Sequence, residues 1–142
     1  MVRKAIIIRT SADQKRCIAI DSDNYVEILA FLKTDARHKS KFADIANILL
    51  AGHRNTQLYD KEEPDARSKG VRAMKFFKGQ ENARIYCREV TLEDKTFIII
   101  ASELLTRKKT QKINRKLLTI IHKVASYDYK EIIDPKTNQR IF

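Results

Sequence analysis

The sequence predicts an α+β fold in which an antiparallel sheet packs against two N-terminal helices and a C-terminal helix. Three observations lead there: two apolar stripes at helical spacing before residue 52, three strand-like segments after residue 70, and an amphipathic stretch after residue 109. The 142 residues suit one domain with one hydrophobic core, and 43% of them are hydrophobic. We therefore expect a single domain over residues 1–142, with an N-terminal strand or hairpin at 1–22 and a tail at 130–142.

The first elements are predicted to be a hairpin and a helix. Ala5–Ile8 and Cys17–Ile20 are β-branched runs on either side of a polar turn, which is typical of two paired strands. Asp23 or Asn24 can then cap a helix by accepting hydrogen bonds from the free amides of its first turn. Apolar side chains at helical spacing indicate that helix, namely Tyr25, Ile28, Leu29 and Leu32.

A second helix and a long loop are expected next. The helix is predicted from Ser40 to Ala51, with Gly52 as its C-terminal stop and the basic residues 37–39 as the turn that precedes it. Residues 55–70 show no periodicity and contain Pro64 within an acidic cluster. We therefore expect a surface loop over that stretch.

Three strands and a closing helix complete the prediction. The strands are Val71–Lys78, Arg84–Thr91 and Thr96–Leu105, and the short connections between them are of hairpin length. The closing helix runs from about Thr110 to Ser126. Its apolar residues recur along one face: Ile113, Leu117, Ile120, Ile121 and Val124.

Positive charge is concentrated around the start of the closing helix. The chain has a formal net charge of +11, and no acidic residue lies between Leu104 and Tyr127. The cations in that interval are Arg107, Lys108, Lys109, Lys112, Arg115, Lys116 and Lys123. Nucleic acid is the obvious polyanion for such a surface, and an acidic membrane face or an acidic protein also fits the charge.

The second predicted strand carries a row of cations and an aromatic ring. Because side chains alternate along a strand, Arg84, Tyr86 and Arg88 should share one face. Such a row can grip phosphates and stack a base. It also fits a solvated face with the tyrosine packed at its edge, and Lys75 on the preceding strand has the same two interpretations.

Several other chemistries are poorly supported. His38, His53 and His122 lack metal-ligand spacing, and three glycines are too few for a phosphate-binding loop, so we expect no metal and no cofactor. The two cysteines are far apart and are interpreted as reduced thiols of a cytosolic protein. The apolar run near the N-terminus is only about four residues, too short for a signal sequence or a membrane helix. We therefore expect a soluble cytoplasmic protein without membrane contact.

The order of elements and three short motifs resemble a known family. The motifs are Met74-Lys75-Phe76 in the first strand, Ala83-Arg84-Ile85-Tyr86 in the second, and an apolar strand, 97–101, that leads to Lys108-Lys109-Thr110-Gln111-Lys112. Together they resemble the RelE/HigB superfamily of bacterial type II toxins, most closely its phage-derived HigB-like branch. The resemblance spans roughly Tyr25 to Tyr129, and its persuasive part is Val71 to Lys116.

The resemblance implies a function and a set of site residues. It implies a RelE-like fold and a ribosome-dependent endoribonuclease, an mRNA interferase of a toxin–antitoxin system, whose partners are mRNA, the ribosome and a small cognate antitoxin. The implied catalytic residues are Lys75 as phosphate binder, Arg84 as transition-state stabiliser, and Arg88. The implied RNA contacts are Tyr86, Lys108, Lys109, Lys112, and Tyr127 or Tyr129.

Two alternatives remain open from the residues themselves. The same basic surface fits a non-enzymatic module that binds RNA or the ribosome. It also fits a protein-interaction domain that holds an acidic partner, because complementary charge speeds and orients association.

Overall fold

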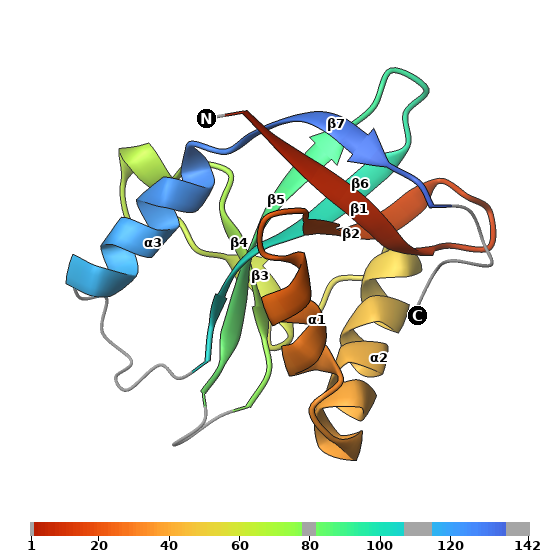
Figure 1. The fold of residues 1–142 in the computed structure, drawn as a ribbon, viewed down its shortest axis with the longest axis horizontal. Coiled ribbons are helices and arrows are strands. Elements are labelled where there is room, and N and C mark those ends of the chain that lie inside the picture. Colours follow the sequence, from red (N-terminus) through yellow and green to blue (C-terminus); the bar gives the residue numbers. More distant parts are fainter. Residues whose placement is uncertain (1, 78–81, 107–114, 136–142) are drawn as a thin grey trace.

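The computed structural model describes residues 2–77, 82–106 and 115–135, and it is an α+β fold built on a seven-stranded sheet (Figure 1). In chain order the elements are β1 (Val2–Thr10), β2 (Arg16–Asp21), α1 (Tyr25–Leu32), α2 (Ala36–Leu50), β3 (Tyr59–Lys61), the 3-10 turn η1 (Ala66–Ser68), β4 (Arg72–Lys75), β5 (Arg84–Thr91), β6 (Phe97–Leu105), α3 (Arg115–Ala125) and β7 (Asp128–Ile133). None of the helices in these ranges is long and apolar enough to cross a membrane.

The sheet is mixed, which corrects the expectation of an antiparallel sheet. Its strand order is β3-β4-β5-β6-β2-β1-β7. The hairpin β1–β2 and the series β3 to β6 pair antiparallel, whereas β2 runs parallel to β6 and β1 runs parallel to β7. Hairpin-length connections indicate only neighbours in the chain. They carry no information on the two parallel pairings, which join segments far apart in the sequence.

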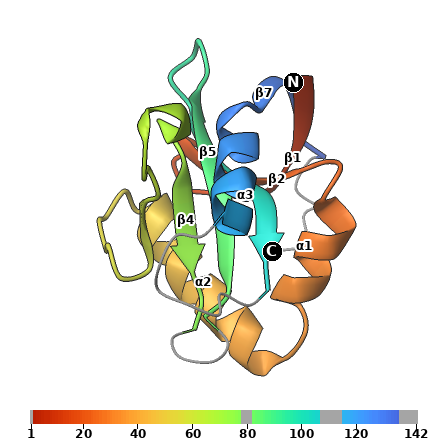
Figure 2. The same cartoon turned by 90° about the vertical axis from the view of Figure 1, so that its left-hand side faces the viewer.

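Helices cover both faces of the sheet. Figure 1 shows α1 and α2 on one side of the strands and α3 on the other, and Figure 2 views the sheet with α3 in front. One core lies under α1 and α2, where Ile28, Phe42 and Ile45 pack against strand residues such as Ile85 and Ile99. A second core lies under α3, where the buried helix residues are Leu117, Ile121 and Val124. Burial on both faces explains the continuous apolar run of β6.

One predicted strand keeps both bounds, a second keeps its end, the strand predicted at Val71–Lys78 is the shorter β4, and one helix begins earlier than expected. β5 spans Arg84–Thr91 as predicted, and β6 ends at Leu105 as predicted. α2 begins at Ala36 because the Asp35 carboxylate accepts a hydrogen bond from the His38 amide at 2.8 Å and so caps the helix. Residues 37–39 therefore lie inside the helix, and their interpretation as a turn is wrong.

The stretch 55–70 and the C-terminal region contain structure that the sequence pattern did not indicate. β3 pairs antiparallel with β4, and η1 is closed by reciprocal hydrogen bonds between Asp65 and Ser68. β7 lies within the range assigned partly to the tail and pairs with β1. Both added strands are short and lie at the sheet edges, where partly exposed side chains lack the strong alternation of a half-buried strand.

Candidate functional site

A basic pocket opens between the N-terminal half of α2, the segment before β3 and the adjoining ends of β4 and β5. Its volume is about 730 Å³. The charged side chains in its wall are Lys41, Asp60, Lys75 and Arg84. The remaining wall residues are Thr56, Gln57, Leu58, Phe76, Phe77 and Asn82. With three cationic side chains and one carboxylate, the pocket wall carries a net positive charge, which favours the binding of an anion.

Strand pairing brings Lys75 and Arg84 together. Lys75 is the last residue of β4 and Arg84 is the first residue of β5, and the two are direct partners in the antiparallel ladder. Directly opposed residues on such a ladder point to the same face, with Cβ atoms about 5 Å apart. The Lys75 ammonium donates a hydrogen bond to the carbonyl oxygen of Thr56 at 3.0 Å, which ties it to the pocket wall.

The guanidinium of Arg84 is buried and largely without acceptors. The residue is only 8% exposed, and within the described residues its Nε and Nη1 atoms have no hydrogen-bond partner. Its Nη2 atom has one long contact, 3.5 Å, to the side-chain oxygen of Asn82. Each unsatisfied buried donor costs about 1–3 kcal/mol, and an unpaired buried charge costs more. A bound anion would remove that cost, and the planar fork of a guanidinium suits two phosphate oxygens.

Arg88 does not share the pocket with Lys75 and Arg84. It lies four residues further along β5, roughly 13 Å away at the rise of a strand. Its Nη1 atom donates to the carbonyl oxygen of Lys69 at 3.3 Å. Gly70 has a positive φ of +88°, and a Cβ there would stand 2.9 Å from the same nitrogen. The structure thus holds Arg88 against the segment that precedes β4.

Tyr86 lies in the core under α3. The alternation predicted for β5 holds, since Ile85 and Cys87 belong to the core under α1 and α2 and Tyr86 belongs to the other. The face that carries Tyr86 is covered by a helix, and its exposed fraction is 0%. Burial raises the pKa of its hydroxyl, which finds no partner among the described residues. The ring therefore offers no surface to a base, contrary to the RNA contact expected of it.

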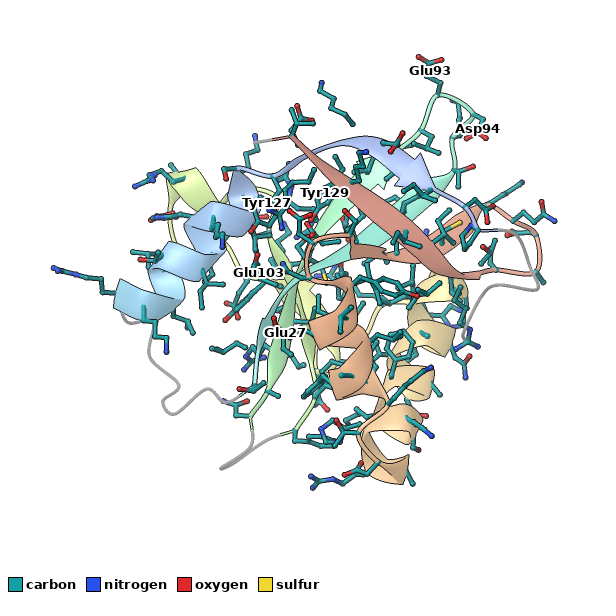
Figure 3. The ribbon with its side chains drawn as sticks, viewed as in Figure 1. Glu27, Glu93, Asp94, Glu103, Tyr127 and Tyr129 are labelled. Carbon is teal, nitrogen blue, oxygen red and sulfur yellow. The ribbon has the colours of Figure 1, made fainter. Side chains whose placement is uncertain are left out.

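Tyr127 and Tyr129 belong to a buried polar network rather than to an exposed surface. Their exposed fractions are 2% and 9%. The Tyr129 hydroxyl lies 2.7 Å from Asp21 Oδ2, to which it donates, and 2.7 Å from Ser102 Oγ. The Tyr127 hydroxyl donates to the Glu103 carboxylate, and Figure 3 shows Glu103, Tyr127 and Tyr129 gathered between α3 and the strands. Burial raises the pKa of both tyrosines.

The same network fixes the N-terminal strand. The Arg3 guanidinium pairs with the Asp21 carboxylate at 2.8 and 2.9 Å and lies 4.0 Å from the centre of the Tyr127 ring. The network of Arg3, Asp21, Glu103 and the two tyrosines therefore joins β1, β2, β6 and the start of β7. These contacts indicate that Tyr127 and Tyr129 hold the sheet edge in place, and neither ring faces solvent as an RNA contact would.

Lys108, Lys109 and Lys112 lie outside the described residues. The last residue of β6 before them, Leu105, is the ladder partner of Arg84. Their expected contacts with RNA therefore rest on the sequence, and the chain enters that basic segment from the end of β6 that adjoins the pocket.

Sequence reasoning missed most of the pocket. Lys41 comes from α2, Asp60 from β3, and Asn82 from the approach to β5, so no local pattern joins them. The one available signal was the pair Phe76-Phe77 directly after Lys75, an aromatic pair beside a cation. Within the described residues no group of three or more His, Cys, Asp or Glu side chains could hold a metal ion. Both cysteines, Cys17 and Cys87, are buried and free.

Comparisons with known protein families, curated proteins and solved structures found no relative of this chain. No family model matches the chain, and neither a curated protein nor a solved structure matches it.

Proposed function

We propose that this chain is an endoribonuclease with a RelE-like fold, and that the basic pocket binds the scissile phosphate of RNA. The observation that carries the proposal is the buried guanidinium of Arg84, whose Nε and Nη1 donors lack acceptors among the described residues. Buried polar groups in folded proteins are nearly always hydrogen-bonded, so unpartnered donors of this kind support a site for a bound anion. Lys75 adds a second cation at the neighbouring ladder position.

The pocket contains the groups that cleavage of RNA at a 2′-hydroxyl requires. The hydroxyl oxygen attacks the adjacent phosphorus, its proton passes to the Asp60 carboxylate, and the bond to the 5′-oxygen breaks. The leaving oxygen takes a proton from water, and the products are a 2′,3′-cyclic phosphate and a 5′-hydroxyl. Arg84 and Lys75 stabilise the charge that develops on the phosphoryl oxygens. Asp60 is the carboxylate of the described pocket wall.

The resemblance to the RelE/HigB toxins extends the proposal to a substrate and a partner. Under it, the substrate is mRNA on the translating ribosome, and a small antitoxin neutralises the enzyme. The basic segment that contains Lys108, Lys109 and Lys112 then contacts RNA beside the pocket.

Induced expression in bacteria tests the enzymatic proposal. Wild type should arrest growth and produce new 5′ ends in mRNA recovered from translating ribosomes. Arg84→Gln removes the buried charge at similar size, so cleavage should fall on the order of 10²-fold or more. Arg67→Gln is the matched control, because Arg67 is exposed on η1 and outside the pocket, and it should cut like wild type. Thermal melting of each purified variant checks that it is folded.

Asp60→Asn separates the enzyme from a binding module. Under the proposal this variant loses cleavage because the proton acceptor is gone, while its affinity for RNA is kept or increased because the pocket becomes more positive. Growth arrest and cutting that persist undiminished in Arg84→Gln would overturn the pocket as the active site. Wild type that binds RNA through Arg84 but never cuts it, with or without ribosomes, would establish the non-enzymatic RNA-binding module instead.

A further inference from the structure

We propose that the basic pocket also contains a nucleobase subsite, with Phe77 as its stacking surface, beside the phosphate position at Arg84. This inference rests on the proposed phosphate site and deepens it. The ligand class is a nucleoside monophosphate unit, either free or as one residue of an RNA strand.

The size of the pocket favours more than a phosphate group. Its volume of about 730 Å³ lies within the range of roughly 300–1,000 Å³ that is usual for sites that enclose whole small molecules. A phosphate on Arg84 and Lys75 would occupy the polar end of the β4–β5 ladder. Phe76 and Phe77 form another part of the same wall, and amide side chains stand nearby at Gln57 and Asn82. Cations, an aromatic ring and amides are the groups that hold a phosphate, stack a base and bond to its edge.

Contacts from α1 and α2 hold the Phe77 ring in place before any ligand arrives. The His38 ring meets Phe77 edge to face, with centroids 5.1 Å apart and an interplanar angle of 81°. His38 is itself fixed, because its Nδ1 atom lies 2.8 Å from the Asp35 carboxylate and its ring meets Phe31 at 4.6 Å. A ring whose orientation is set in advance loses little entropy on binding, which favours affinity.

A cation accompanies the ring. The guanidinium carbon of Arg37 lies 4.2 Å from the centre of Phe77. Phe77 is only partly buried, whereas its neighbour Phe76 is 3% exposed and belongs to the core. A partly exposed aromatic ring with a guanidinium over it, in the wall of a cationic pocket, is a surface on which a base can stack with added cation–π attraction. Phe77 packs against the core under α1 and α2 and still keeps part of its ring exposed in the pocket wall.

Titration calorimetry with three probes tests the subsite. The probes are inorganic phosphate, ribose 5-phosphate and adenosine 5′-monophosphate, which share the phosphate and differ in the base. Stacking of one base should make the nucleotide bind roughly 5- to 150-fold more tightly than ribose 5-phosphate. Phe77→Leu keeps an apolar side chain and should remove that advantage while the affinity for inorganic phosphate stays unchanged. Phe77→Tyr should retain the advantage.

Phe97→Leu is the matched control for these variants. Phe97 also has a guanidinium over its ring, that of Arg16 at 4.6 Å, but it begins β6 and pairs with Thr91 at the other end of β5. Its replacement should leave the binding of all three probes as in wild type. Equal effects of Phe97→Leu and Phe77→Leu would mean that lost packing, and no base contact, explains the change.

The outcomes separate the subsite from the proposed function. Equal affinities for the nucleotide and ribose 5-phosphate, both lost in Arg84→Gln, would overturn the base subsite and leave the phosphate site standing. If Arg84→Gln left the affinity for all three probes unchanged, the phosphate site and the base subsite would both be overturned. Nucleotide binding that needs Phe77 and Arg84, without any RNA cleavage, would support the subsite and contradict the endoribonuclease. Tighter binding of a short oligoadenylate than of the mononucleotide would identify a strand as the ligand, and equal binding a free nucleotide.

Discussion

Arg84 illustrates how one residue can oppose stability and favour binding. Its side chain is more than nine-tenths buried, yet no described carboxylate forms an ion pair with it. Removing a charge from water costs several kcal/mol unless a partner compensates. Two polar neighbours do not compensate the charge. Asn82 accepts one long hydrogen bond from the guanidinium, and Lys75, the ladder partner, carries a like charge that repels it. The buried charge of Arg84 therefore lowers the stability of the ligand-free protein and favours the binding of an anion.

Arg84→Met should make the protein more stable and unable to bind phosphate. Replacing a buried charge by an apolar side chain of similar length should raise the free energy of unfolding by roughly 1–4 kcal/mol, as measured by urea titration without phosphate. Phosphate at 100 times its dissociation constant should stabilise wild type by about 2.7 kcal/mol and leave Arg84→Met unchanged. Arg67→Met on the exposed side of η1 should change stability by no more than about 0.5 kcal/mol. A loss of stability in Arg84→Met would show that the guanidinium is satisfied after all.

At the scale of elements, α3 is held over the sheet by its apolar stripe and by a polar contact to η1. The stripe predicted from helical spacing is confirmed for Leu117, Ile121 and Val124, which are buried, while Ile120 is partly buried. Ile113, the first residue of the predicted stripe, lies outside the described residues. At the polar contact, Nε2 of His122 lies 2.8 and 3.0 Å from the two oxygens of Asp65. The hydrogen bond with His122 is the main reason that the pKa of Asp65 lies below its usual value, and bonds with Ser68 add to it.

Asp65→Asn should weaken the contact between α3 and η1 in a pH-dependent way. Because the pKa of Asp65 is lowered in the folded state, its carboxylate stabilises the fold above the unfolded value of about 3.9, and that stabilisation is lost as the pH falls through the folded value. The variant should melt below wild type at pH 5 to 6, and the difference in Tm should shrink below about pH 4. Asp44→Asn, on the exposed side of α2, should melt like wild type throughout. A difference for Asp65→Asn that persists undiminished at pH 3 would contradict the ionic contribution.

At the scale of the whole molecule, excess positive charge is the property most directly tied to a polyanionic partner. The formal charge of +11 exceeds what solubility requires of a chain of this length. The described pocket contributes Lys41, Lys75 and Arg84, and the segment 107–114 adds further cations next to β6 in the chain. Long-range attraction of this kind speeds association with RNA and weakens as salt screens it.

Replacing Lys108, Lys109 and Lys112 together by Gln should flatten the salt dependence of RNA binding. Each lysine that neutralises a phosphate releases a counterion, so three lost contacts should reduce the slope of log affinity against log salt by roughly two. The matched control replaces three exposed lysines and changes the net charge equally. They are Lys15 on the β1–β2 turn, Lys95 on the β5–β6 turn and Lys130 on β7. If both triple variants flatten the slope alike, net charge alone explains the binding and the 107–114 segment makes no specific contact.

Residue patterns along the chain are enough to predict the α+β class, the bounds of β5, the end of β6 and the buried stripe of α3. These features follow from local geometry, because side chains alternate along a strand and recur every three or four residues along a helix. The same local rule placed Arg84, Tyr86 and Arg88 on one face of β5. The expectation that Lys75 and Arg84 share a site came from the family resemblance, and the pairing of β4 with β5 makes them direct ladder partners.

Tertiary contacts determine which of those side chains line the basic pocket. α3 covers Tyr86, the network around Asp21 encloses Tyr127 and Tyr129, and Arg88 is drawn to the carbonyl oxygen of Lys69. Lys41 of α2 and Phe77, which follows β4, join Arg84 of β5 in the wall of one pocket. Periodicity along a chain records which residues share a face, whereas burial depends on what another segment lays over that face. Contacts between distant segments follow from how the strands are ordered in the sheet, and no local pattern of residues contains that order.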